Sequence, residues 1–417
     1  MKTDSPTNEL SPGEEARLYP YARRNLRVLP FANGLSSMGF ALCWPFLPLM
    51  MLSLGVRDNL ETWVGYMMLV FYVISFLSGP VWGGLADSFG RKIMILRAML
   101  GMGVFMSLIP FAPTPLWFAF LFALVGFFNG ANMSSQALLV ANTPPARIGS
   151  GLSLLQTGAL VGQTMGPALG TFLAAVIDKP HWMFWISGGL LLTGGGLVTI
   201  WVREIKQLTP GPWRPQWIGS LRELVAGPRV GVLFYLSFVF AMLWTGSVTI
   251  LSIFVLRILE TQPGGAGSVV FWAGAVAMGL SLSSVVALPF WGRVLDRWGA
   301  ERVLTMATAA AALTQLPLLF LETPLQLVLT RVAFGLSACA MLPSIVRLLR
   351  NYVRPGMDAR AISYSASFQF IAMGLAPFCA GMIGPAWGLR AYFALTTVLT
   401  IVGLVLWIRS GRQTAVQ

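Results

Sequence analysis

The chain has 417 residues, of which 56% are hydrophobic and only 10% are charged, whereas soluble domains carry about 25% charged residues. With a mean hydropathy of +0.73, this composition excludes a disordered chain, a disulfide-rich secreted module and an ordinary soluble enzyme. The net charge of +13 is not gathered in a basic cluster with exposed aromatics, so it favours cytoplasmic loops over nucleic-acid binding. The bilayer is therefore the solvent in which this chain is expected to fold.

Twelve stretches are long and apolar enough to cross a bilayer, and each is predicted to be a helix. In chain order they cover 26–53, 61–84, 93–111, 115–139, 150–177, 181–202, 229–258, 267–292, 302–320, 324–348, 359–384 and 389–409. The proline-rich segment 203–228 interrupts the pattern and is predicted to be a linker. The sequence thus predicts an all-α membrane protein with two pseudo-symmetric six-helix bundles, divided as a tail (1–25), a first bundle (26–202), the linker, a second bundle (229–409) and a tail (410–417).

Basic residues are distributed unevenly over the predicted loops. If the N-terminus is cytoplasmic, 23 of the 28 Lys and Arg residues fall on the cytoplasmic side and four fall outside. The positive-inside rule then places both termini and the linker in the cytoplasm. The polar first twenty residues lack the apolar region of a cleavable signal peptide.

The two halves of the chain align at a constant shift of 209 residues. Pro80, Trp82, Gly83, Asp87 and Gly90 correspond to Pro289, Trp291, Gly292, Asp296 and Gly299, Thr114 corresponds to Thr323, and Gly126 to Gly335. A repeat of six spans keeps its orientation in the membrane, so the halves are expected to be related by an axis along the membrane normal. Rocking of the two halves around a central cavity is the motion that such a duplication predicts.

The loop after the second span reads GGLADSFGRK over 83–92, and its counterpart after the eighth reads GRVLDRWG over 292–299. A carboxylate near a helix start suits the helix dipole, and the glycines permit tight turns. The residues expected to control conformation are Gly83, Asp87, Gly90, Arg91, Gly292, Asp296, Arg297 and Gly299. The loop resembles the GxLaDrxGrk signature of the major facilitator superfamily, although the family's Arg after the Asp is Ser88 in the first copy. A purely structural turn is the alternative interpretation.

The fifth span carries Gly158, Gly162, Gly166 and Gly170 at intervals of four, a pattern that lets helices pack closely. The run Gly162-xxx-Gly166-Pro167-xx-Gly170 resembles the gxxxGPxxGG motif of drug-exporting antiporters, with Thr171 at the final Gly. Small-residue packing alone is the alternative reading. Taken with the loop motifs, the chain resembles bacterial twelve-span multidrug efflux proteins of the drug:proton antiporter group. This resemblance implies an inner-membrane location and alternating access.

Two departures from that group concern charge. Its usual Arg in the fourth span is absent, because Arg331 in the tenth span aligns with Phe122 in the fourth. All fifteen carboxylates fall in tails, loops or span ends, so the sequence offers no acid at membrane depth to carry a proton. Proton coupling is therefore left open.

Polar and aromatic side chains recur on single faces of several spans and predict a wet substrate cavity. The candidates are Asn33, Ser37, Trp44, Asn129, Asn132, Gln136, Gln163, Trp244, Arg331 and Gln369, with Gln156, Thr245 and Ser365 beside them. Interhelical hydrogen bonding is the alternative for each. Arg331 is expected either to pin helices through carbonyls or an amide such as Gln369, or to anchor substrate.

These observations predict a secondary transporter that exports small amphipathic organic compounds. The alternative is an exporter or facilitator of one metabolite, such as a sugar, siderophore or lipid-like compound. An enzyme is not expected, because the chain has one His and no acid at membrane depth, and a Walker motif is absent. The three cysteines lack CxxC spacing. No catalytic residue, metal or cofactor is predicted. The expected partners are substrate, the lipid bilayer and, in the case of proton coupling, protons, without nucleic acid, and the chain is expected to be a monomer.

Overall fold

The computed structural model describes residues 14, 17–177, 179–205, 228–260, 269–353 and 358–414. A few side chains inside these helices also lie outside the description, including those of Gly83 and Asp87. Within the described ranges every regular element is helical. The predicted linker lies almost entirely outside them.

The elements of the first half follow the predicted spans closely. They are α2 (Ala22–Cys43), η1 (Trp44–Phe46), α3 (Leu47–Ser53), α4 (Leu60–Phe89), α5 (Arg91–Leu108), η2 (Ile109–Phe111), α6 (Pro115–Phe128), α7 (Ala131–Ala141), α8 (Pro145–Val176) and α9 (His181–Trp201). Those of the second half are α11 (Pro228–Glu260), α12 (Val269–Trp298), α13 (Ala300–Gln315), η4 (Leu316–Leu319), α14 (Pro324–Ala338), α15 (Met341–Tyr352), α16 (Asp358–Trp387) and α17 (Leu389–Thr414).

Eleven helical segments among the described residues are long and apolar enough to cross a membrane. They coincide with every predicted span except the fifth. That span lies in α8, which has 32 residues. Part of its C-terminal turn lies outside the description, and the count covers the described residues only.

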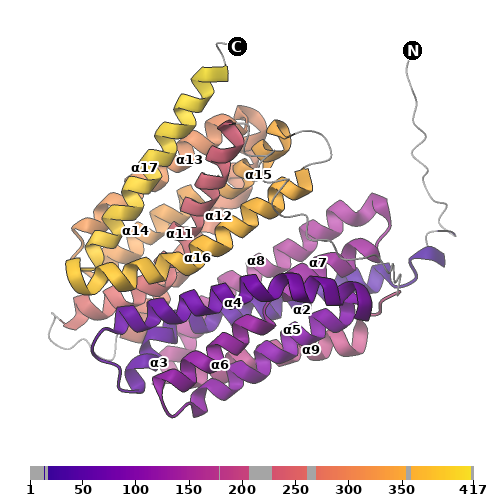
Figure 1. The fold of residues 1–417 in the computed structure, drawn as a ribbon, viewed down its shortest axis with the longest axis horizontal. Helices are drawn as coiled ribbons and strands as arrows, with labels where there is room; N and C mark the ends of the chain where they lie inside the picture. The colour runs from indigo at the N-terminus through magenta and orange to yellow at the C-terminus, as the bar shows by residue number, and fades with distance from the viewer. Residues whose placement is uncertain are drawn as a thin grey trace.

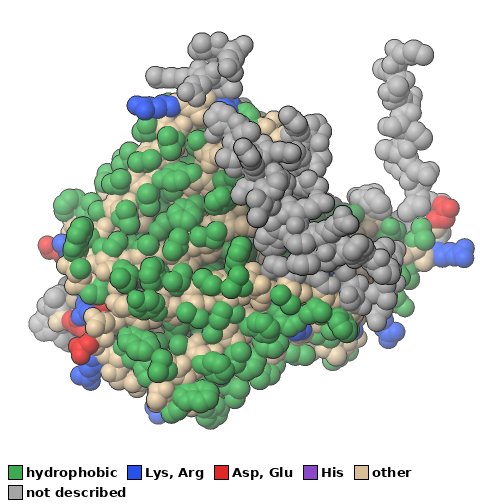
Figure 2. All heavy atoms as spheres, viewed as in Figure 1, with side chains coloured by type: hydrophobic (Ala, Val, Ile, Leu, Met, Phe, Trp, Pro, Cys, Tyr) green, Lys and Arg blue, Asp and Glu red, His purple; other side chains and the backbone are tan. Residues whose placement is uncertain are grey.

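The helices from α2 to α9 gather on one side of the molecule and those from α11 to α17 on the other, with α4 and α16 side by side between them (Figure 1). Hydrophobic side chains cover most of the part of the face that is visible in Figure 2, and most of the charged side chains in view lie toward its margins. This distribution is what a bilayer requires of the surface it surrounds.

The shift of 209 residues seen in the sequence recurs in the hydrogen bonds. The indole of Trp82 donates to the carbonyl of Phe127 at 2.8 Å, and that of Trp291 donates to the carbonyl of Leu336 at 2.7 Å. Ser75 likewise donates to Gly126, and Ser284 to Gly335. The threonines 114 and 323 both cap the helix that follows them. The repeat is therefore a repeat of contacts as well as of residues.

The predicted fourth and tenth spans are each broken at equivalent places. In the fourth, α6 ends at Phe128 and α7 begins at Ala131, with Gly130 at a φ of 121°. In the tenth, α14 ends at Ala338 and α15 begins at Met341. A positive φ favours Gly at this position because it has no Cβ. The breaks place Asn129 at the end of a helix instead of on a continuous helical face.

Candidate functional site

Three of the predicted cavity residues form one cluster between α2 and α7. The amide of Asn33 donates to Asn132 Oδ1 at 3.3 Å, and Gln136 donates to the same oxygen at 3.2 Å. Asn33 is buried, whereas Asn132, Gln136 and Ser37 are half-buried. The cluster therefore joins two helices and still presents polar atoms at its edge.

Asn129 lies at the break between α6 and α7, away from this cluster. Its side chain accepts a hydrogen bond from the backbone N–H of Gly130 at 2.8 Å and so stabilises the break. The guanidinium of Arg97 lies 4.0 Å from the centre of the Trp82 ring and donates to the carbonyls of Phe127 and Asn129, both at 3.4 Å. Arg97 is one of the 23 basic residues counted on the cytoplasmic side, and this contact was not predicted. The sequence did contain a signal for this contact. Arg97 lies inside the predicted third span, opposite a stretch of the fourth span that contains Gly.

Trp44 is buried in a group of aromatic rings rather than exposed on a wall. Its ring contacts Phe40 at 5.4 Å, Tyr72 at 6.0 Å and Phe71 at 6.4 Å between ring centres. Tyr72 also lies 6.4 Å from Phe370 of α16. The aromatic group therefore extends from the first half to the second.

The long helix α8 exposes two opposite faces of different character. Leu154, Val161, Met165 and Phe172 form an apolar face, as expected for contact with lipid. Gln156 and Gln163, seven residues apart and thus on one face, are exposed on the opposite side. Exposed amides in a helix of this kind require water or a polar ligand. The polar face of α8 is thus the clearest wet surface among the predicted candidates.

The candidates of the second half are less exposed. Gln369 is half-buried and donates to the carbonyl of Ser365, one turn earlier, at 3.3 Å. The hydroxyl groups of Ser365 and Ser237 lie 2.7 Å apart and join α16 to α11. Trp244 is half-buried against Phe240. These contacts are interhelical or intrahelical and do not form one cluster with Asn33.

The glycine series of α8 packs directly on the backbone of α2. A Cβ added at Gly158 would lie 2.3 Å from the carbonyl oxygen of Pro30, and one at Gly162 would lie 2.0 Å from that of Gly34. At Gly166 the distance to the carbonyl oxygen of Met38 would be 2.6 Å. Pro167 is buried in the same helix, and Gly170 would meet the ring of Phe46. The series is therefore a site of backbone contact between two helices.

The loop motif differs between its two copies. In the first, Gly90 has a φ of 99°, and the Glu204 carboxylate accepts hydrogen bonds from the backbone N–H groups of Arg91 and Lys92 at 2.8 and 2.9 Å. In the second, Gly299 has a φ of 81°. There Asp296 pairs with Arg347 of α15 at 2.6 Å. The Asp87 side chain lies outside the description.

Arg297, which follows Asp296 in the second copy, is exposed. A Cβ added at Gly292 would meet nothing within 4 Å. Neither residue is therefore held by close packing at this position.

Arg331 is completely buried between helices and does not face an open cavity. Its Nη2 donates to Gln315 Oε1 of α13 at 3.0 Å, and its guanidinium lies 5.1 Å from the centre of the Phe334 ring. The amide that it contacts is thus Gln315, where the sequence analysis suggested Gln369. The aligned residues of the first half are Phe122 and Met106, both buried. A polar pair in one half replaces an apolar pair in the other.

An ion pair joins the two halves at one end of the molecule. Glu61 at the start of α4 is only 5% exposed, and its Oε1 accepts from Arg257 of α11 at 3.0 and 3.2 Å. Next to it, the Thr62 hydroxyl donates to the carbonyl of Gly381 in α16 at 2.7 Å. Arg257 also contacts Glu260 at 3.4 Å. We call the contact of Glu61, Thr62, Arg257 and Gly381 the inter-half contact.

Glu61 is one of the fifteen carboxylates that fall in tails, loops or span ends, and its burial was not predicted. The signal was its position as an acid at the start of a span, on the side where the sequence has few basic residues, with Arg257 among those few. A burial of this kind requires a partner, but the residues alone did not identify which Arg supplies it.

The profile of the Major Facilitator Superfamily matches residues 29–282 and 265–416. The chain belongs to this superfamily. It is 31% identical over 390 residues to the multidrug resistance protein MdtG of Salmonella arizonae, covering 92% of this chain and 94% of that protein. It is 30% identical over 405 residues to MdtG of Klebsiella pneumoniae, covering 95% of each. These relatives confirm the resemblance to multidrug efflux proteins, and the chain is a multi-pass membrane transporter and not an enzyme.

Solved structures support the fold. The nucleoside transporter NupG is similar with a TM-score of 0.75 at 13% identity, over 93% of this chain and 98% of that one. The human organic anion transporter MFSD10 has a TM-score of 0.66 at 16% identity, over 93% and 99%. At these identities the likeness concerns the arrangement of helices alone.

Proposed function

We propose that this chain exports small amphipathic organic compounds across a bacterial inner membrane by alternating access between two six-helix bundles. The observation that carries the proposal is the set of contacts between α4 and α16, together with the exposed amides of α8. Contacts between α4 and α16 run from Glu61 to Tyr72 and from Phe370 to Gly384. The polar face of α8, with Gln156 and Gln163, is exposed. In this proposal the α4–α16 contacts form the closed end of a pathway, and the amides of α8 belong to its wet wall.

In this proposal α8 is the fifth of twelve membrane spans, and both termini and residues 203–228 lie in the cytoplasm, as the positive-inside distribution predicts. The inter-half contact then lies at the outer surface, and the conformation is open to the cytoplasm. An impermeant thiol reagent tests this orientation on a variant with Gln207→Cys and the native cysteines replaced. No labelling in intact cells and labelling after permeabilisation are expected. Labelling in intact cells would reverse the topology.

The proposed substrates are largely apolar compounds that are neutral, zwitterionic or carry one positive charge. The proposed pathway offers amides, hydroxyls and rings, such as Gln163, Asn132 and Trp244, and these cannot neutralise two positive charges at membrane depth. Transport into proteoliposomes of inverted orientation, measured over a panel with matched mono- and dications, tests this specificity. Selective uptake of dications would contradict it, and uptake confined to one metabolite would favour the alternative of a specific exporter.

We further propose that protons drive the cycle and that the inter-half contact takes part in the coupling. Glu61 is buried and paired with Arg257 in this contact, so the substitution Glu61→Gln would remove the charge that holds Arg257. The neighbouring charged groups are Glu260 and Arg390, which is at the same end. Uptake with and without an imposed pH gradient tests the coupling in the native protein and in Glu61→Gln. Equal stimulation of both proteins by the gradient would remove Glu61 from the coupling.

We also propose that the loop motifs set the balance between conformations. The pair of Asp296 and Arg347 fixes the end of α12 to α15 within the second half, and the positive φ of Gly90 and Gly299 allows the chain to turn directly into the next helix. Asp296→Asn is expected to reduce transport while the protein remains folded. Unchanged transport at normal expression would reduce the motif to a turn.

A further inference from the structure

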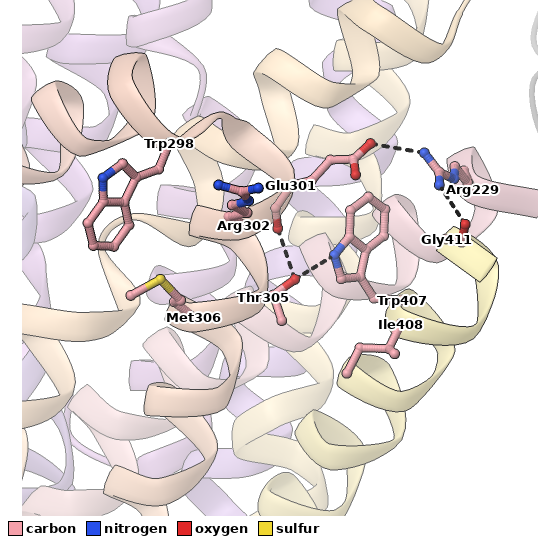
Figure 3. Close-up of a pocket in the computed structure, with 9 residues that line it drawn as sticks. All are labelled: Arg229, Trp298, Glu301, Arg302, Thr305, Met306, Trp407, Ile408 and Gly411. Carbon is pink, nitrogen blue, oxygen red and sulfur yellow. Dashed lines mark hydrogen bonds and ion pairs between the residues drawn. The ribbon is translucent and has the colours of Figure 1, made fainter. Parts of the chain in front are cut away.

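A cavity of about 650 Å³ lies between the C-terminal end of α12, the first turns of α13 and the end of α17. Figure 3 shows Trp298 and Met306 on one side, Trp407 and Ile408 on the other, and Arg302 between them. The remaining lining residues are Arg229, Glu301, Thr305 and Gly411. We call this cavity the α13–α17 groove. It is distinct from the inter-half contact and from the proposed substrate pathway.

The groove carries one positive charge, that of Arg302, which none of the described residues neutralises. Glu301 pairs with Arg229 at 3.0 Å, and Arg229 also donates to Tyr352 and to the carbonyls of Ser410 and Gly411. Arg302 is exposed, and no ion pair or hydrogen bond of its guanidinium is found in the described part of the chain. The groove therefore presents a free guanidinium, the group that best matches the planar geometry of a phosphate.

In the first half, a carboxylate of the protein itself occupies the equivalent helix start. There the Glu204 carboxylate binds the first backbone N–H groups of α5, and a Cβ added at Gly90 would lie 2.9 Å from that carboxylate. At Gly299, the equivalent residue, an added Cβ would meet nothing within 4 Å. The shift of 209 residues aligns Glu204 with Gln413, which is neutral. The carboxylate that lies next to Gly90 in the first half thus has no counterpart next to Gly299 among the described residues.

The surroundings of Arg302 identify the kind of anion. Trp298, Met306 and Ile408 are each at least 41% exposed and lie at or near the ends of segments that can cross a membrane. Tryptophan at a span end is typical of the headgroup level of a bilayer, and basic pockets between helices at this level bind acidic lipid headgroups. The exposed thioether and alkyl groups below Arg302 suit an acyl chain.

We propose that the α13–α17 groove binds an anionic phospholipid of the surrounding leaflet. Its phosphate lies on the Arg302 guanidinium at the start of α13, and an acyl chain runs along Met306 and Ile408. The proposal does not depend on what the transporter exports.

Native mass spectrometry of the detergent-purified full chain tests the proposal by titration with phosphatidylglycerol and with phosphatidylcholine. The native protein is expected to bind phosphatidylglycerol more tightly than phosphatidylcholine. Arg302→Ala is expected to weaken phosphatidylglycerol binding about fivefold, since one basic residue near an anionic surface contributes about 1 kcal/mol. Arg350→Ala is the matched control, because Arg350 is an exposed Arg at the end of α15 and does not line the groove. It should leave binding unchanged.

A second variant is designed from the alignment of the two halves. Gln413→Glu places a carboxylate at the position aligned with Glu204, and it is expected to weaken phosphatidylglycerol binding at least as much as Arg302→Ala does. Equal effects of Arg302→Ala and Arg350→Ala, or equal affinity for the two lipids, would overturn the site. Displacement of the lipid by millimolar inorganic phosphate would show that the groove takes free phosphate, and it would overturn the assignment to a lipid.

Discussion

The two halves of the molecule share hydrogen bonds at a constant shift, yet they join their first and fifth spans in different ways. In the first half α2 and α8 meet backbone to backbone at Gly158 and Gly162. In the second half side chains separate α11 from α16: Phe234 stacks on Phe368 at 5.4 Å, and Ser237 bonds to Ser365. The residues aligned with the glycine series are Ser367, Ile371, Leu375 and Cys379. The antiporter-like motif is thus a property of one half and not of the repeated scaffold.

This difference indicates which helix contacts in each half can accept a substitution. Side chains at a helix contact can adopt new rotamers, whereas a backbone contact cannot take up even one methyl group without moving a helix. The contact of α2 with α8 therefore fixes the two helices to each other as one unit. Since α8 also packs on α12 of the second half, we expect α2 and α8 to move together when the halves rock.

The largest expected effect comes from filling the backbone contact. Gly162→Val places atoms where a Cβ alone would lie 2.0 Å from the Gly34 carbonyl oxygen, a clash that side-chain movement cannot relieve. We expect loss of most of the folded protein, measured as the monodisperse peak after detergent extraction. Gly196→Val in α9 is the control, because an added Cβ there meets nothing within 4 Å. A normal peak for Gly162→Val would show that the contact is loose.

A smaller effect is expected at the buried pair that only the second half has. Arg331→Ala leaves Gln315 without this partner and opens a cavity, for which we expect a destabilisation of about 3 kcal/mol. The double variant Arg331→Phe with Gln315→Met copies Phe122 and Met106 of the first half. We expect it to recover most of the lost thermal stability, because buried polar pairs can be replaced by apolar residues that pack well.

Transport by this double variant separates the two interpretations of Arg331. Transport at the native rate would make Arg331 a structural residue. A folded double variant that does not transport would give it a functional role, although it is closed off in the present conformation. No recovery of stability would show that the surrounding helices differ too much between the halves for the exchange.

Substitutions in the inter-half contact are expected to have smaller effects than the core substitutions described above. Replacing Glu61 by Gln removes charge-assisted hydrogen bonds worth about 1.5–3 kcal/mol, so the inter-half contact should lose stability and transport should fall about tenfold. Exchanging the charges, with Glu61→Arg and Arg257→Glu together, is expected to restore part of the rate. Glu260→Gln is the control, since it removes only an exposed contact of Arg257. A rate for the exchanged pair no better than for Glu61→Gln would argue against a gate.

The sequence predicted the helices, the repeat and the family because each depends on patterns within short stretches. Hydropathy located the spans, and a constant shift located the motifs. Contacts across the chain were harder to foresee. Trp44 and Arg331 carry the composition of a cavity wall but are enclosed, since the sequence does not tell which face of a span turns toward a neighbouring helix. The burial of Glu61 depends on Arg257, nearly two hundred residues away, and the break at Gly130 interrupts a helical face that the spacing had treated as continuous.

The smallest expected effect concerns the helix start that the first half caps and the second leaves open. Glu204→Gln weakens the acceptor for the backbone N–H groups of Arg91 and Lys92 and removes a negative charge from the positive end of α5. Loss of a helix cap costs about 1 kcal/mol, which for a chain of this length corresponds to a fall in Tm of roughly 1–2 °C. Glu322→Gln, at an exposed acid before α14, is the control and should leave Tm unchanged.

If the first half relies on its own carboxylate while the second relies on a lipid, added phosphatidylglycerol should raise the Tm of the native protein and of Glu204→Gln by the same amount. A lipid effect that vanishes in Glu204→Gln would instead place the lipid in the first half.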